Sequence, residues 1–483
     1  MRIRNLIDKE SDFMKKKLIS ALALPILVLG TLTGCGSKKT IAPFVMPENG
    51  YDGSEVTITF YHAWGQNNQE FIRDYIVKPF NKLFPNIHID DQYIGDYDAV
   101  RDKIVNDITV KNLPSLSFCY PDHIALYNRS NVVITLDQFM NDTKEYQATD
   151  AEGNTFTYTF GMTSEQKSDI IDAYYEEGKI FGYNLMYSLP FAKSTEVLYY
   201  NKDFFDKNNL TVPTTWDEMW DVCAEIKKID PDCFPLGYDS SSNWFITMCE
   251  QLGSGYTTND PNNYFVFNNK ENKDWLTALK GKYTDGLFTT KGLTGTYTSS
   301  LFTSAADVDN KGCCYLCIGS SGGSTYQLPE KDSEGKYPFN IGVVRTPVVE
   351  GKNHKAIQQG PNICLFNNGN AQEICASWLF LKYIETNPEM QANLSLKTGY
   401  SPSLKSVYDL KAYKNWMDEG STIQALAAKV CSEQNDSYFV SPAFVGSSKA
   451  RDEVGSLLDA VLTGKDIDAS FNTALEECEY MAE

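Results

Sequence analysis

Positively charged side chains and histidine are scarce in this chain of 483 residues. It has 43 Lys and Arg against 63 Asp and Glu, which gives a formal net charge of −20, and only 4 His. A field of this sign repels nucleic-acid phosphates, so we predict no nucleic-acid partner. The few histidines, and the lack of a second cysteine pair at a zinc-like spacing, predict no metal and no cofactor. The sequence also lacks a His-Glu-x-x-His motif and a Walker-type loop.

Apolar runs long enough to cross a membrane are lacking too. The uncharged run 18–29 falls short of the roughly 20 residues that a spanning helix needs. It follows Met14-Lys15-Lys16-Lys17 and precedes Leu32-Thr33-Gly34-Cys35, the layout of a secretory signal peptide. The last four residues resemble the lipobox of bacterial lipoproteins, in which the cysteine sulfur carries the lipid. We therefore predict a signal peptide over 1–34 (with Met14 as an alternative start), lipidation of Cys35 and a lipidated tether over 35–53.

Cysteine is not scarce, but its pattern argues against a disulfide framework. Of 12 Cys in the chain, eleven follow Cys35, and an odd number cannot all pair internally. We interpret most of them as small buried hydrophobic side chains. The run Cys313-Cys314-Tyr315-Leu316-Cys317-Ile318 is short, apolar and bounded by Gly312 and Gly319. This pattern favours a buried strand over a metal site.

Strand and helix patterns alternate along the chain. Residues 55–61 are β-branched and apolar, residues 67–84 carry apolar side chains at helical spacing, and a second strand begins at residues 86–89. Such a strand–helix–strand unit predicts an α/β fold with a parallel sheet. The chain is too long for one typical domain, yet it shows no long linker and no internal repeat. We therefore expect two lobes that share the chain by crossing over more than once.

Two neighbouring stretches carry a family resemblance. Residues 196–205, Glu-Val-Leu-Tyr-Tyr-Asn-Lys-Asp-Phe-Phe, and residues 213–218, Pro-Thr-Thr-Trp-Asp-Glu, closely resemble a signature of bacterial extracellular solute-binding proteins of the family-1, carbohydrate-binding type. Thr214 or Thr215 is predicted to cap the helix that starts at Trp216. Further matches follow in the family's order over about residues 55–405, at 58–64, 311–320, 339–347, 359–362 and 397–403.

The resemblance implies a type II periplasmic-binding-protein-like fold, with a ligand cleft between two α/β lobes. The expected division places 54–161 and 311–365 in the N-terminal lobe, and 162–310 and 366–483 in the C-terminal lobe. The implied function is to bind a sugar or oligosaccharide by lobe closure and to deliver it to the permease of an ABC importer, without chemistry on the solute. The protein would be a monomer, anchored by its lipid to the outer face of the cell membrane.

Candidate ligand contacts follow the predicted strands, because ligands of open α/β sheets bind beyond the carboxyl ends of strands. Sugars stack on aromatic rings and pair their hydroxyls with planar polar groups. On these grounds we select Trp64, Tyr120, Asp122, Tyr187, Asn243, Trp244, Ser320, Ser321, Gln359, Asn362 and Tyr400. Core packing is the alternative interpretation of Trp64, Trp244 and Tyr400, and capping of a helix is the alternative for Asp122.

Other functions remain open at this point. The same fold could bind a polyamine, a peptide or glycerol phosphate, and a sensor lipoprotein would share the same sequence features. A secreted glycoside hydrolase would need only two suitably placed carboxylates, which the many Asp and Glu could supply.

Overall fold

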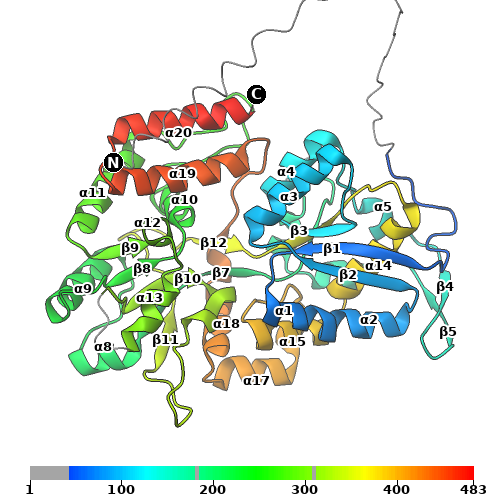
Figure 1. Ribbon diagram of the computed structural model, residues 1–483, viewed down its shortest axis with the longest axis horizontal. Helices are drawn as coiled ribbons and strands as arrows, with labels where there is room; N and C mark the ends of the chain where they lie inside the picture. The colour runs from blue at the N-terminus through cyan, green and yellow to red at the C-terminus, as the bar shows by residue number, and fades with distance from the viewer. Residues whose placement is uncertain (1–42, 180–183, 307–311, 483) are drawn as a thin grey trace, which may run out of the picture. The chain divides into compact units, whose positions relative to one another are not determined.

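The computed structural model describes residues 43–179, 184–306 and 312–482 (Figure 1). The predicted signal peptide, the lipidation site Cys35 and the first part of the tether lie outside the described residues. Residues 41–483 form one compact unit, which holds both sheets described below.

The first sheet has five strands in the order β2-β1-β3-β13-β6. They are β1 (Val56–His62), β2 (Ile87–Tyr93), β3 (Leu116–Cys119), β6 (Leu189–Pro190) and β13 (Asn362–Leu365). Val56 pairs with Ile87 in parallel register, so the predicted strand–helix–strand unit is confirmed. Figure 1 shows α3 (Tyr97–Val110) and α4 (Pro121–Tyr127) on one face of this sheet, and α1 (Gln66–Phe71) and α2 (Lys78–Leu83) on the other. A π-helical turn, Ile72–Val77, joins α1 to α2.

The second sheet has the order β14-β12-β7-β10-β8-β9, with β11 also paired to β7. Its strands are β7 (Ser194–Asn201), β8 (Leu236–Tyr238), β9 (Phe288–Thr290), β10 (Leu316–Ser320), β11 (Ile341–Val344), β12 (Ala356–Gln359) and β14 (Tyr438–Phe439). Helices α10 (Ser241–Leu252), α11 (Lys270–Thr284), α19 (Ser447–Leu462) and α20 (Ile467–Ala482) pack together beside it. We call the five-stranded sheet, with the helices packed on it, the first lobe. The other sheet, with its helices, is the second lobe.

The remaining elements complete the two lobes. On the first lobe they are α5 (Asp137–Met140), the hairpin β4 (Tyr146–Thr149) and β5 (Thr155–Tyr158), α6 (Ser164–Asp169), α7 (Asp172–Glu177), α14 (Ala371–Glu385), α15 (Pro388–Thr398), α16 (Lys405–Asp409) and α17 (Lys411–Glu419). On the second lobe they are α8 (Lys202–Asn208), α9 (Trp216–Ile229), α12 (Lys291–Thr294), α13 (Ser299–Thr303), the 3₁₀ segment η4 (Ser321–Gln327) and α18 (Ile423–Glu433).

Each lobe has its own apolar core. Trp378 of α14 is fully buried in the first core, where its ring stacks on Phe139 with centroids 5.3 Å apart. Trp244 of α10 is buried in the second core. The eleven Cys after Cys35 are all buried and free, which confirms their interpretation as apolar core residues. Thr215 caps α9 together with Glu218, as the sequence predicts.

The chain passes between the sheets several times, which confirms the predicted crossovers, but the predicted lobe boundaries are wrong in three places. Of residues 311–365, only β13 joins the first sheet, because β10 pairs with β7 and β8, and β11 and β12 also pair with β7. Conversely, α14 and α15 pack in the first core although 366–483 was expected in the other lobe. Residues 162–179 and 184–190 also belong to the first lobe, although 162–310 was expected in the other. An apolar pattern identifies a strand but not its neighbour.

Candidate ligand-binding cleft

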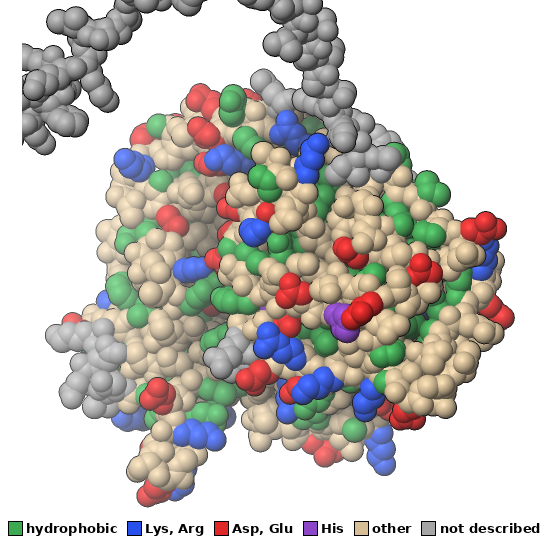
Figure 2. Space-filling model, turned by 45° about the vertical axis from the view of Figure 1, so that its right-hand side comes forward, with side chains coloured by type: hydrophobic (Ala, Val, Ile, Leu, Met, Phe, Trp, Pro, Cys, Tyr) green, Lys and Arg blue, Asp and Glu red, His purple; other side chains and the backbone are tan. Residues whose placement is uncertain are grey.

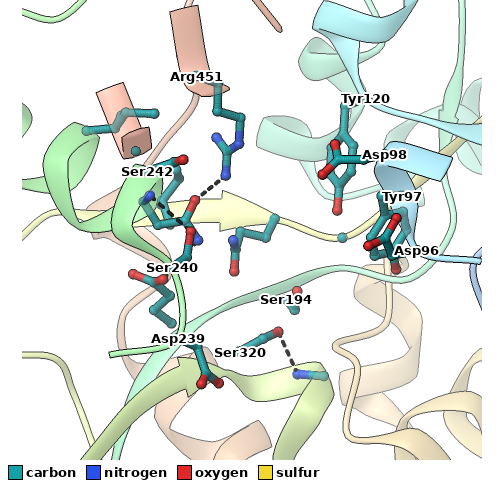
Figure 3. Close-up of a pocket in the computed structure, with 18 of the residues that line it drawn as sticks. Asp96, Tyr97, Asp98, Tyr120, Ser194, Asp239, Ser240, Ser242, Ser320 and Arg451 are labelled. Carbon is teal, nitrogen blue, oxygen red and sulfur yellow. Dashed lines mark hydrogen bonds between the residues drawn. The ribbon is translucent and has the colours of Figure 1, made fainter. Parts of the chain in front are cut away.

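A cavity of about 1090 Å³ is lined by residues of both lobes. The loops that follow β1, β3, β8 and β10 reach it, together with the first turns of α10 and α19. These loops lie at the carboxyl ends of strands, where α/β sheets place their ligands. Figure 3 shows side chains of the two lobes facing one another across this pocket.

One side of the cavity, which we call the first wall, consists of Trp64, Tyr97, Tyr120 and Tyr400. The ring centroids of Trp64 and Tyr400 are 5.3 Å apart, as are those of Tyr97 and Tyr120. The hydroxyls of Tyr97 and Tyr400 are 3.1 Å apart, within hydrogen-bond distance. Behind this wall Trp64 packs on Phe118 and Phe191 of the core, so its ring is held in place.

The opposite side, which we call the second wall, is polar. It consists of Glu196, Asp239, Ser240, Ser241, Ser242, Asn243, Arg451 and Asp459. Ser240 is the N-cap of α10 and Ser241, Ser242 and Asn243 form its first turn, where backbone N–H groups favour electron-rich partners. Arg451 and Asp459 lie further along α19. Figure 3 shows Ser240, Ser242 and Arg451 of this wall across the pocket from Tyr97 and Tyr120.

Glu196 organises the centre of the second wall. Its carboxylate accepts hydrogen bonds from the Tyr238 hydroxyl at 2.6 Å and from Nδ2 of Asn243 at 2.8 Å. Oδ1 of Asn243 in turn accepts from the Arg451 guanidinium. Burial raises the pKa of Glu196 to about 7, although both hydrogen bonds oppose this shift.

Two further carboxyl groups of the second wall are engaged by protein donors. Asp239 accepts from the backbone N–H and the hydroxyl of Thr298, at 2.8 and 2.7 Å. Asp459 accepts from Ser241 at 2.7 Å and from Thr290 at 3.0 Å. Burial raises the pKa of both carboxyl groups.

The three Lys and Arg side chains that line the cavity also have partners. Arg101 of α3 contacts Asp98, Asp102 and Asp452 at 3.0–3.3 Å. Arg451 donates to Asn243, and the Lys291 ammonium lies 3.8 Å from the centre of the Tyr297 ring. Eight carboxyl groups line the same cavity, so an anionic ligand meets a field of its own sign. Across the visible face of the molecule, Figure 2 shows acidic and basic side chains interspersed.

The lobes contact each other directly at the cavity. Arg101 of the first lobe donates through Nη1 to Ser448 at 3.1 Å and to Asp452 at 3.3 Å, both on α19 of the second lobe. Beneath the cavity, the buried Lys193 ammonium donates to Glu177 at 2.5 Å, to the Gly360 carbonyl at 2.9 Å and to Asn362 at 3.1 Å. This cluster ties together the segments by which the chain passes between the sheets.

Seven of the selected candidates line the cavity: Trp64, Tyr120, Asp122, Asn243, Ser320, Gln359 and Tyr400. The carboxylate of Asp122 accepts from its neighbour, the backbone N–H of His123, at 3.0 Å. Ligand contact by any of these residues stays a prediction.

The other four candidates lie behind the cavity. Trp244 stacks on Tyr238 and Trp216 in the second core, with centroids 4.5 and 5.5 Å apart. Tyr187 belongs to a small apolar cluster of the first lobe. Ser321 accepts from the backbone N–H of Thr195 at 3.2 Å, and Asn362 binds Lys193 and Ser188. The side chains of these four residues point into packed protein.

Sequence reasoning missed several lining residues, among them Tyr97, Glu196, Tyr297, Tyr326 and Arg451. Tyr97 and Arg451 each start a helical pattern, and nothing in such a pattern tells which helix end meets a cavity. Glu196 is the first residue of the stretch that resembles the family signature, so the resemblance could have identified it as a candidate.

A short motif at the end of β10 resembles a hydrolase nucleophile elbow. Residues 319–323 read Gly-Ser-Ser-Gly-Gly, which fits Gly-x-Ser-x-Gly with Ser321 at the nucleophile position. Ser321 is fully buried, and the four His make their contacts elsewhere: His62 with Asp91, His88 with Glu55, His123 with Tyr120, and His354 with Thr346. A nucleophilic serine needs an adjacent base and an open approach, and the described surroundings of Ser321 supply neither.

Within residues 43–179, 184–306 and 312–482, no group of three or more His, Cys, Asp or Glu is placed to hold a metal ion. Among the helices in these ranges, none has the length and hydropathy needed to cross a membrane.

Curated relatives and solved structures resemble this chain over most of its length. The sn-glycerol-3-phosphate-binding periplasmic protein UgpB of Salmonella typhimurium is 24% identical over 376 residues, which cover 75% of this chain and 78% of UgpB. Its counterpart in Escherichia coli K12 is 25% identical over 367 residues, covering 73% and 76%.

Among solved structures, the GacH receptor of Streptomyces glaucescens, determined unliganded and with acarbose, superposes with a TM-score of 0.69 at 16% identity, over 88% of this chain and 98% of that one. UgpB of Mycobacterium tuberculosis, in complex with glycerophosphocholine, gives the same TM-score, identity and coverage. These likenesses confirm the predicted two-lobed α/β fold.

A family model described as bacterial extracellular solute-binding protein matches residues 75–418, which is well over half of the chain. This match agrees with the resemblance read from residues 196–218, and it fits a fold with a large cavity between two lobes. The chain belongs to the family of bacterial extracellular solute-binding proteins.

Proposed function

We propose that this protein is the extracytoplasmic solute-binding component of an ABC importer, and that its solute is a neutral sugar or oligosaccharide. The observation that carries the proposal is the pairing of an aromatic first wall with a hydroxyl-, amide- and carboxylate-rich second wall across one cavity. Sugars present an apolar C–H face and a rim of hydroxyls, so the two walls match the two kinds of surface.

A phosphate ester is the second candidate, because the curated relatives are named for binding sn-glycerol 3-phosphate. Arg101 and Arg451 are the guanidinium groups that would bind the phosphate. Both already have partners in the protein, and eight carboxyl groups line the same cavity. An anionic ligand would have to displace these partners against the local field, so the cleft favours a neutral polyol.

Closure of the lobes would couple binding to transport. A ligand that contacts both walls stabilises the arrangement in which Arg101 reaches α19, and a closed state is the signal that an importer permease could recognise. No step of this cycle requires chemistry on the solute. Incubation with oligosaccharides should therefore yield no cleavage products, whereas a glycoside hydrolase would release shorter sugars.

Thermal unfolding of the purified full chain tests the ligand class. The chain is heated with neutral mono- and oligosaccharides, with polyamines and with glycerol phosphates in turn. A ligand at a hundredfold excess over its Kd should stabilise the folded state by about 2.7 kcal/mol. A shift with carbohydrates alone supports the proposal, while a shift with phosphate esters or amines alone contradicts the ligand and leaves the fold in place.

We also propose that the protein is a monomer held at the outer face of the cell membrane by a lipid on Cys35. The support is the Leu32-Thr33-Gly34-Cys35 sequence after a basic, apolar amino terminus. Changing Cys35 to Ala should abolish incorporation of a labelled fatty acid and move the protein from the membrane to the soluble fraction. Unchanged labelling would contradict this assignment.

A further inference from the structure

Two exposed tyrosines stand at the mouth of the cleft, outside the first wall. Tyr297 is 54% exposed and Tyr326 is 71% exposed, and both line the cavity. Among the large hydrophobic and aromatic side chains that the described residues leave exposed, these two alone line it. Exposed rings that line a cavity can stack on a ligand, so their position points to binding.

Both rings sit on firmly anchored segments of the second lobe. Tyr297 immediately precedes Thr298, which is fully buried and donates twice to Asp239, and Lys291 covers one face of the Tyr297 ring. Tyr326 belongs to η4, which is capped by Ser320 and packs against α13, the helix that follows Tyr297. Asp239 and Ser320, the anchors of the two segments, appear together at the base of the pocket in Figure 3.

The two tyrosines continue the aromatic surface of the first wall. A side chain at Gly322 of η4 would meet the Tyr400 ring at 2.6 Å, so bare backbone lets η4 lie directly against Tyr400. Burial raises the pKa of the Tyr400 hydroxyl, and Tyr326 and Tyr297 raise it further, as expected for neighbouring phenols. In the described part of the chain, neither Tyr297 nor Tyr326 stacks on another aromatic ring, so ring surface is free for a ligand.

We propose that Tyr297 and Tyr326 form an outer sugar-binding platform, and that the solute is an oligosaccharide longer than a disaccharide, which reaches from the two walls onto this platform. This inference rests on the proposed function. The cavity volume of about 1090 Å³ lies at the upper end of the range of about 300–1,000 Å³ that is common for small-molecule sites, as a large ligand requires.

The test first identifies the sugar that the protein binds and then measures how the binding affinity depends on the length of that sugar. The full chain is incubated with partial hydrolysates of several neutral polysaccharides, and native mass spectrometry gives the mass of the bound sugar. Calorimetric titration then compares the captured oligosaccharide with its own mono- and disaccharide fragments. We expect an oligosaccharide longer than a disaccharide to be captured, and to bind more tightly than either fragment.

Variants assign the length preference to the two rings. Tyr297→Ala and Tyr326→Ala should each weaken binding of the oligosaccharide by roughly two- to tenfold while leaving disaccharide binding unchanged. The Phe variants, which keep the rings, should bind as the unchanged protein does. The matched control is Tyr337→Ala: Tyr337 is 43% exposed with Lys331 4.8 Å from its ring centre, but it does not line the cavity.

The outcomes separate the two proposals. Carbohydrate binding that does not depend on length, or Ala variants that bind the oligosaccharide as Tyr337→Ala does, would overturn the platform and leave the proposed function standing. Failure to capture any carbohydrate, with a thermal shift by another ligand class, would overturn both.

Discussion

The two walls of the cleft present their side chains in different ways. On the first wall, rings pack on the apolar core behind them, so their position follows from the same burial that folds the lobe. On the second wall, carboxylates, amides and hydroxyls hold one another through hydrogen bonds such as those around Glu196. The first wall can therefore offer an apolar surface, and the second can offer oriented donors and acceptors. A ligand that uses both needs one apolar face and many hydroxyls.

Removing the central ring of the first wall should have the largest effect. Trp64→Ala should lower the free energy of unfolding by about 3–5 kcal/mol and abolish detectable ligand binding by the folded protein, because it removes both core packing and the stacking surface. Urea unfolding and calorimetric titration measure the two effects. Trp216→Ala is the matched control, since Trp216 stacks on Trp244 away from the cavity and should lose stability but not affinity. Unchanged affinity in Trp64→Ala would contradict a binding role for the first wall.

Glu196 of the second wall should make the free energy of unfolding depend on pH. The pKa of Glu196 is raised from 4.5 to about 7 in the folded protein, so the protonated form favours folding. This contribution is fully present below pH 4.5 and is lost as the pH rises through 7. It amounts to at most about 3 kcal/mol.

A Glu196→Gln variant isolates this contribution, because the other buried carboxyl groups remain in both proteins. We expect the unchanged protein to lose stability relative to Glu196→Gln between pH 5 and pH 8, as measured by urea unfolding at both pH values. Parallel pH profiles for the two proteins would show that Glu196 is not held by burial as the structure indicates.

Removing the direct contact between the two lobes should have the smallest effect. Arg101→Met removes the link from α3 to Ser448 and Asp452 on α19, and should weaken ligand binding by up to about tenfold, mainly through faster dissociation. Stopped-flow release kinetics measures this change. Arg73→Met is the control, because its ion pair with Asp91 stays within the first lobe and its side chain is 52% exposed. Equal effects of the two variants would mean that Arg101 does not act across the cleft.

Local features of this fold could be predicted from the sequence because neighbouring residues determine them. The Thr215 cap, the parallel pairing of β1 with β2 and the burial of the cysteines all depend on short-range patterns. The partners of β10 and the lobe of α14 could not be predicted, since an apolar strand or helix fits either sheet.

In the site, too, the positions of residues along the chain could be predicted, whereas the directions of their side chains could not. Trp64, Tyr120 and Ser320 follow strands whose ends open on the cavity. Trp244 lies near the start of α10, but its side chain turns into the core, where Tyr238 and Trp216 cover it. Which side of a helix faces a cavity depends on tertiary packing, and this is why Arg451 of α19 was missed.

A crystal structure of the complex with the captured sugar tests the central claim most directly. The account predicts a neutral carbohydrate between the lobes, with ring faces against Trp64 and Tyr400 and hydroxyls bound to Asn243 and Arg451. A ligand whose phosphate or amine group occupies the second wall, or one that contacts a single lobe, would contradict it.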